Sequence, residues 1–137
     1  RKNKAGDVSF ANVVTISFAD LANRTSFTAN QQVWEQNGIT VTNDKASSNN
    51  DVANYSNPAR FYAGSNITIE TEKAMSQIVF NCADSKNLSL SDGSGYTVSG
   101  SGTYKVTITL TTPATSFTIT KLSGQVRASS IEVTIAE

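Results

Sequence analysis

The feature that most constrains the fold of this chain is a strict alternation of apolar and polar residues. It is clearest from residue 104 to residue 111, where the sequence reads Y-K-V-T-I-T-L-T. Successive side chains of a β-strand point to opposite faces, so this pattern predicts a strand with one face in the core and the other in solvent. By this alternation we expect Tyr104 to face the core together with Val106 and Ile108.

The same alternation recurs along the chain, with turn-forming residues between the runs. The alternating groups are Val14, Ile16 and Phe18; Ile39 and Val41; Ile67 and Ile69; Leu88 and Leu90; Phe117 and Ile119; and Ile131, Val133 and Ile135. Asn-Gly, Asp-Gly and Ser-Gly steps separate many of them, and we expect a further turn around Pro113.

About nine to eleven short strands, with no long helical period, predict an all-β fold. The expected architecture is an antiparallel β-sandwich, with a jelly roll as its topology. We assign residues 10–137 to a single β-sandwich domain and residues 1–9 to a flexible N-terminal tail.

Composition excludes several classes of function. The 137 residues include 11 basic and 11 acidic ones, and no basic patch that would attract nucleic acid is evident. No apolar run approaches the roughly 20 residues of a membrane-spanning helix, so we expect no membrane insertion. The absence of histidine excludes Ser–His and Cys–His catalysis. Cys82 is the only cysteine, and its phase with Ile78 and Phe80 predicts a small buried side chain.

A long loop rich in Asn, Ser and Asp separates the alternating runs at residues 39–41 and 67–69. Such loops are uncommon in compact domains unless they have a function. The far side of the loop carries Tyr55, Arg60, Phe61 and Tyr62. If the segment after the loop is extended, Phe61 faces the core while Arg60 and Tyr62 share the outer face. We therefore expect the functional site at this loop and the residues that follow it.

Flat aromatic rings beside amides and a guanidinium are typical of a sugar-binding surface, because the rings stack on sugar C–H faces and the polar groups orient the hydroxyls. We predict stacking by Trp34, Tyr55 and Tyr62. The predicted hydrogen-bonding groups are Arg60, Asn54 and Gln36. Trp34, the only tryptophan, has two interpretations: a sugar platform, or packing at the edge of the core.

Two carboxylates were considered for catalysis. Glu70 and Glu72 would share one face of a strand roughly 7 Å apart, a separation between those of retaining and inverting glycosidases. The alternative is a solvated strand end. Because no other feature indicates a cleft around them, we predict a non-catalytic protein.

A structural calcium ion was also considered, because the long loop offers hard oxygen ligands. The candidate ligands are Asn43, Asp44, Asn49, Asn50 and Asp51. Their order does not match an EF-hand loop, and a solvated Asn/Asp-rich loop explains the same residues. We therefore assign no cofactor.

The run N-P-A-R-F-Y-A-G-S-N-I-T-I at residues 57–69, followed by I-V-F-N-C at residues 78–82, is the most characteristic part of the chain. Together with the segments Gln32–Ile69 and Leu122–Ile135, it resembles accessory domains in large secreted proteins of gut anaerobic bacteria. Such domains accompany polysaccharide-degrading enzymes and are similar to non-catalytic carbohydrate-binding modules with β-sandwich folds.

The resemblance implies a secreted or cell-surface module that binds a plant polysaccharide or oligosaccharide, with xylan as the first guess. It also implies a covalently attached catalytic domain, a glycoside hydrolase, that the module holds against its substrate. We expect the module to be a monomer.

The alternative is a structural or adhesive β-sandwich domain of a bacterial surface protein, which threonine-rich strands without histidine would also suit. Some such domains carry a Lys–Asn isopeptide bond beside a buried acid. Lys105, Asn81 and Glu70 are the candidates for these roles, although alternation places Lys105 on the outer face.

Overall fold

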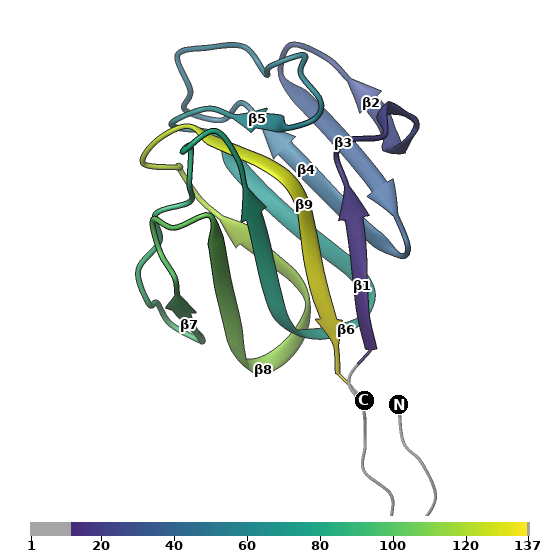
Figure 1. Cartoon of the computed structure of the whole chain (residues 1–137), viewed down its shortest axis with the longest axis vertical. Coiled ribbons are helices and arrows are strands. Elements are labelled where there is room, and N and C mark those ends of the chain that lie inside the picture. Colours follow the sequence, from purple (N-terminus) through teal and green to yellow (C-terminus); the bar gives the residue numbers. More distant parts are fainter. Residues whose placement is uncertain (1–11, 137) are drawn as a thin grey trace, which may run out of the picture.

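The computed structural model describes residues 12–136, which form nine strands and one short 3-10 turn (Figure 1). In chain order the elements are β1 (Asn12–Ser17), η1 (Leu21–Asn23), β2 (Arg24–Phe27), β3 (Gln31–Gln36), β4 (Ile39–Asp44), β5 (Ala59–Phe61), β6 (Asn66–Cys82), β7 (Tyr96–Ser99), β8 (Lys105–Ile119) and β9 (Val126–Ile135). All strand pairs in this part of the chain are antiparallel. The predicted tail, residues 1–9, lies outside the described residues.

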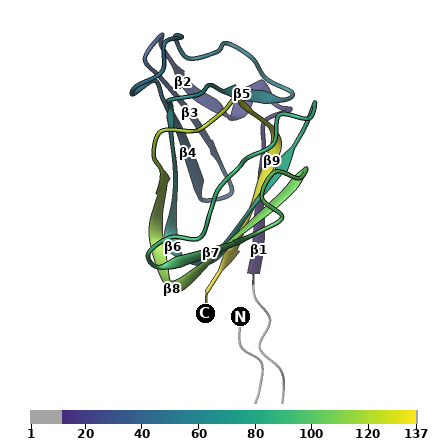
Figure 2. The same ribbon diagram turned by 90° about the vertical axis from the view of Figure 1, so that its left-hand side faces the viewer.

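Two long strands, β6 and β8, pair with each other and organise the fold. The first half of β6 also pairs with β4, and its second half pairs with β9. One half of the molecule therefore has the order β2-β3-β4-β6-β8, and the other has the order β1-β9-β6-β8-β7. Figure 2 shows that the sheet curls around an interior instead of lying flat.

The sheet bends where the pairing of β6 with β8 is interrupted. Regular pairing stops at Glu70 and resumes at Gln77, with an isolated pair between Met75 and Ala114. Pro113 lies in this interruption, within the continuous strand β8. The prediction of a turn around Pro113 is therefore wrong: a proline has no N–H to donate, and an irregularity in the pairing accommodates it without ending the strand.

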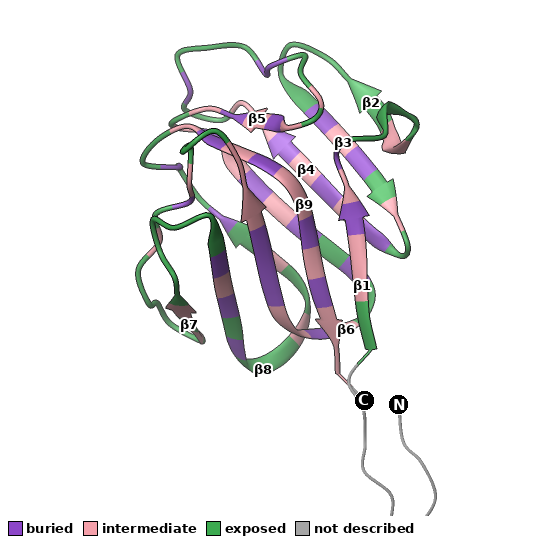
Figure 3. Ribbon diagram, viewed as in Figure 1, coloured by how far each residue is buried: buried purple, intermediate pink, exposed green. Residues whose placement is uncertain are grey.

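The core follows the predicted alternation. In Figure 3, buried residues alternate with less buried ones along β4 and the first half of β8. The largest fully buried side chains include Phe18, Trp34 and Phe61. Their rings meet edge to face, with centroids 5.1 Å apart for Phe18 and Trp34 and 5.9 Å apart for Phe18 and Phe61. The prediction of an all-β, antiparallel sandwich is confirmed. The jelly-roll topology stays a prediction, because β6 and β8 run through both halves of the sheet.

Tyr104 was expected in the core but is 73% exposed. It lies just before β8, after a tight turn in which the Thr103 N–H donates to the Gly100 carbonyl oxygen at 2.9 Å. Alternation predicts the face of a residue only inside a strand, and this turn ends the strand geometry before Tyr104. The pair Leu88 and Leu90 likewise lies outside the strands, although Leu88 is fully buried.

Cys82 ends β6 and packs against the core, but it is only partly buried. Burial raises the pKa of its thiol above the ordinary value, and a hydrogen bond with the backbone of Leu88 opposes this shift. The side chain that we expected to be buried is therefore only partly so. The thiol is nevertheless a poor nucleophile, because the thiolate is the reactive form.

Candidate functional site

The loop of residues 45–58 joins β4 to β5 and is tied down along its length, arching over the top of the molecule in Figure 1. Four backbone N–H groups of the loop donate to carbonyl oxygens outside it. The bonds are Lys45 to Asn30 (2.9 Å), Ser47 to Gly64 (3.0 Å), Val52 to Ala29 (2.8 Å) and Asn57 to Phe18 (3.0 Å). Lys45 and Asp51 form an ion pair of 2.9 Å within it. Val52 and Ala53 are buried. The loop therefore has a defined shape without regular secondary structure, as a binding platform needs.

Tyr55 projects from this loop and is 48% exposed. The Cζ atom of Arg60, on β5, lies 3.6 Å from the centre of the Tyr55 ring, so the guanidinium covers one face of the ring. The two residues predicted from the sequence are thus brought together. The exposure of Tyr55 leaves part of its ring surface for a ligand.

A second arginine contacts the loop at Asn54, the residue before Tyr55. Arg24, the first residue of β2, donates from Nη1 to Oδ1 of Asn54 at 2.6 Å. Its Cζ also lies 4.7 Å from the centre of the Phe27 ring, which is 37% exposed. These contacts, together with the chain link between Asn54 and Tyr55, connect a group of residues that we call the Tyr55 patch: Arg24, Phe27, Asn54, Tyr55 and Arg60.

A buried amide holds the Tyr55 patch to the sheet. Asn43, on β4, is 1% exposed, and its Nδ2 donates to the carbonyl oxygen of Arg60 at 3.1 Å. Phe61 is fully buried beside Arg60. Because the backbone of Arg60 is held from the core and its side chain lies on Tyr55, the guanidinium is well positioned before any ligand binds.

The other predicted residues, Trp34, Gln36 and Tyr62, have different environments. Trp34 is 0% exposed, so the prediction that it stacks on a sugar is wrong. It faces inward from β3 and packs on Phe18, so the second interpretation, packing in the core, is the right one. Oε1 of Gln36 accepts the N–H of Ser17 at 2.8 Å. Gln36 therefore fastens β3 to β1 instead of presenting its carbonyl to a sugar. Tyr62 follows β5 and is half-buried, as Arg60 is.

Sequence reasoning missed Arg24 and Phe27. No local signal links residue 24 to residue 54, because the contact depends on the pairing of β2 with β3 and on the path of the long loop. Arg24 lies opposite Trp34 in this pairing, and its guanidinium carbon is 6.0 Å from the centre of the tryptophan ring. It therefore covers the edge of the core at the point where a buried tryptophan approaches the surface.

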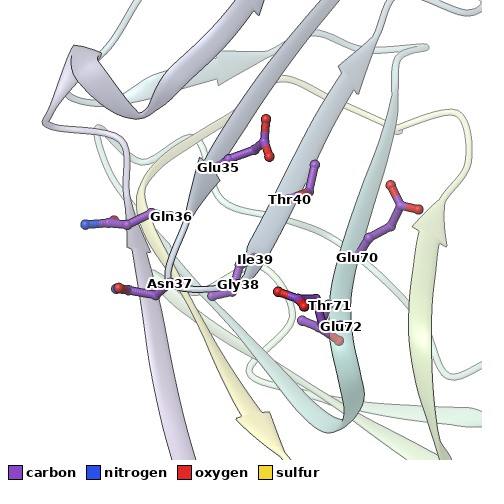
Figure 4. A pocket seen from close by; sticks show the side chains of 9 residues that line it. All are labelled: Glu35, Gln36, Asn37, Gly38, Ile39, Thr40, Glu70, Thr71 and Glu72. Carbon is purple, nitrogen blue, oxygen red and sulfur yellow. The ribbon is translucent and has the colours of Figure 1, made fainter.

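A second candidate is an open hollow of about 540 Å³ at the far end of the β3–β4 hairpin (Figure 4). Glu35, Thr40 and Glu70 lie opposite one another on β3, β4 and β6, and Glu72 follows at the bend. With one strand between them, the backbones of Glu35 and Glu70 are roughly 10 Å apart. In Figure 4 the side chains of Gln36 and Asn37 point away from these carboxylates. The hollow contains no aromatic or guanidinium group, so it suits a sugar less well than the Tyr55 patch does.

Two of the candidate calcium ligands, Asp44 and Asp51, bond within the loop. Oδ1 of Asp44 accepts the N–H of Ala46 at 3.1 Å, as in an Asx turn, and Asp51 is paired with Lys45. Within residues 12–136 no three His, Cys, Asp or Glu side chains are placed to hold an ion.

No known protein family, curated protein or solved structure matches this chain. In the part of the chain that the structure describes, no helix is both long and apolar enough to cross a bilayer. The function is therefore argued from the chemistry of the Tyr55 patch.

Proposed function

We propose that this chain is a non-catalytic carbohydrate-binding module that holds an attached glycoside hydrolase against a plant polysaccharide, with xylan as the first candidate. The module acts as a monomer, outside the cell or at its surface. The observation that supports this function best is the half-exposed Tyr55, whose ring is covered on one face by Arg60 and whose preceding residue, Asn54, is bonded to Arg24.

The composition of the patch suits a sugar ring. The exposed part of Tyr55 offers an apolar surface for sugar C–H groups, while the amide of Asn54 and the two guanidinium groups offer partners for hydroxyls. One stacking contact of this kind contributes only about 1 kcal/mol. The affinity should therefore be modest, and the benefit to an attached enzyme is a raised local concentration of substrate.

The test is affinity electrophoresis and calorimetry against xylan, mixed-linkage glucan, mannan and starch. We expect at least one polymer to retard the protein, and Tyr55→Ala to weaken that binding by about fivefold or more, since the loss of one stacking contact costs about 1 kcal/mol.

Tyr104→Ala is the matched control, because Tyr104 is the other strongly exposed tyrosine and is not part of the Tyr55 patch. If no polymer is bound, the proposed function is wrong. If binding survives Tyr55→Ala and Arg60→Ala unchanged, the function stands but its site lies elsewhere.

One observation favours the alternative of a structural or adhesive domain. Asn81 and Lys105 lie directly opposite each other on β6 and β8, and Nδ2 of Asn81 donates to Oε2 of Glu132 at 2.8 Å. Glu132, not Glu70, would thus be the acid beside a Lys–Asn isopeptide bond. Lys105 is exposed, however, and does not lie in the core beside this acid. An intact mass lower than the sequence mass by one ammonia, and restored by Lys105→Ala, is the result that this alternative requires.

A further inference from the structure

We propose that the Tyr55 patch selects acidic glycans, chains that carry uronate carboxylates, over neutral ones. This inference rests on the proposed carbohydrate-binding function and names the class of sugar. It follows from the guanidinium of Arg60, which lies on an exposed tyrosine, and from that of Arg24, which is bonded to the residue before this tyrosine; neither has an acidic partner among the described residues.

The first step is the pairing of two arginines. β5 and β9 place Arg60 directly opposite Arg127, so both side chains leave the same face of the sheet. Like charges in this position repel each other. Arg127 is neutralised by Asp84, whose Oδ2 lies 3.2 Å from Nη1 of Arg127, and its Nε donates to Gln125. Arg60 forms no ion pair with any carboxylate among residues 12–136.

The second step is the orientation of Arg60. Stacking on Tyr55 uses the flat face of the guanidinium, whereas hydrogen bonding uses its edge. The described part of the chain supplies no acceptor to the Arg60 side chain, while its face lies on the ring at 3.6 Å. A guanidinium held by its face with a free edge matches the two oxygens of a carboxylate, which it binds through two parallel charge-assisted hydrogen bonds.

The third step is the surrounding charge. Arg24 is bonded to the neutral amide of Asn54, next to Tyr55 in the chain, and has no acidic partner among the described residues. The nearest loop carboxylate in the chain, Asp51, is already paired with Lys45. The patch thus carries a local positive charge although the whole chain has no net charge.

The experiment compares glucuronoxylan with the same polymer after chemical reduction of its carboxyl groups, by affinity electrophoresis and calorimetry. Polygalacturonate and dextran sulfate complete the series. We expect glucuronoxylan or polygalacturonate to bind about tenfold or more tightly than the carboxyl-reduced polymer, as the loss of charge-assisted hydrogen bonds predicts. The preference should fall as salt is added.

Two variants of Arg60 and one control variant test the role of this residue. Arg60→Gln should abolish the preference for the acidic polymer, while Lys73→Gln, which removes an exposed charge at the bend of β6, should leave it unchanged. Arg60→Lys keeps the charge without the planar fork and should recover only part of the preference.

The outcomes separate the two proposals. Equal binding of glucuronoxylan and its reduced form, or an unchanged preference in Arg60→Gln, overturns the acidic selectivity and leaves carbohydrate binding intact. Dextran sulfate binding as tightly as the uronates also overturns it, because the patch would then be a general anion site. Failure of every polymer, neutral or acidic, rejects the proposed function itself.

Discussion

At the scale of single residues, the two aromatic side chains that the sequence makes most conspicuous have opposite environments. Trp34 is 0% exposed and Tyr55 is 48% exposed. Both precede polar residues, so the local sequence does not distinguish them. The difference arises because Trp34 is an inward-facing residue of a strand between two neighbours, whereas Tyr55 projects from a loop.

The core near Trp34 contains a polar residue that costs stability. Gln32 is 0% exposed, and neither polar atom of its amide has a partner among the residues that the structure describes. Burying an amide without hydrogen bonds is unfavourable, so Gln32→Met, which has nearly the same volume, should raise the free energy of unfolding by about 1–2 kcal/mol. Urea denaturation measures this change.

The exposed neighbour Gln31 provides the control, because Gln31→Met should alter stability by less than about 0.5 kcal/mol. A Gln32→Met protein that is less stable than the parent would contradict the prediction and indicate that the amide is satisfied inside the core.

At the scale of elements, the long loop and the turn after β5 are fitted to each other through Gly64. This residue has a φ of +87°, and a Cβ atom built on it would lie 2.9 Å from backbone atoms of Ser47 and Ser48. The N–H of Ser47 donates to the carbonyl oxygen of Gly64 at 3.0 Å, and the N–H of Gly64 donates to the carbonyl oxygen of Leu122 at 2.8 Å. The loop that carries Tyr55 therefore has its position set by a close backbone approach that only glycine permits.

Gly64→Ala should lower the free energy of unfolding by about 2–4 kcal/mol, because it combines a strained backbone with a clash that moves the start of the loop. Gly95→Ala is a matched control, since Gly95 has a φ of +86° but no atom within 4 Å of the added Cβ. The control should lose only about 1 kcal/mol, the cost of the backbone conformation alone. Equal losses in the two variants, measured by thermal denaturation, would contradict the role given to the contact with Ser47.

At the scale of the whole molecule, the continuity of β6 and β8 joins the two halves. Each strand contributes to both strand orders, and the core residues of both halves form one cluster. Neither half can separate without breaking the pairing of these strands. This arrangement predicts cooperative unfolding of residues from both halves.

The chain carries its own reporters for this prediction, one in each half. Trp34 lies on β3, and Cys82 ends β6 beside β9. In urea, the red shift of the tryptophan emission and the labelling of the thiol in short pulses should give the same midpoint. Labelling of the folded protein should be slow at neutral pH, since partial burial raises the pKa of Cys82 and so lowers its thiolate fraction. Separate midpoints would show that the two halves unfold independently.

Much of the fold could be predicted from the sequence, but less of the site. The period of two is a local property, so alternation predicted the strands and the burial of Phe61, Ile108 and Val133. Alternation failed at Tyr104, where a turn precedes the strand, and turn chemistry failed at Pro113, where an interrupted pairing accommodates the proline. The contact of Arg60 with Tyr55 was predicted only as proximity in the chain.

The sequence by itself determined the all-β class and most of the core, because a strand exposes its residues alternately whatever lies beside it. Only the tertiary structure decided that Trp34 is buried, that Arg24 reaches Asn54, and that Arg60 faces Arg127. These facts depend on which distant strands pair and in which register. The sign of the charge around Tyr55, and with it the class of sugar that we propose, follows from that pairing.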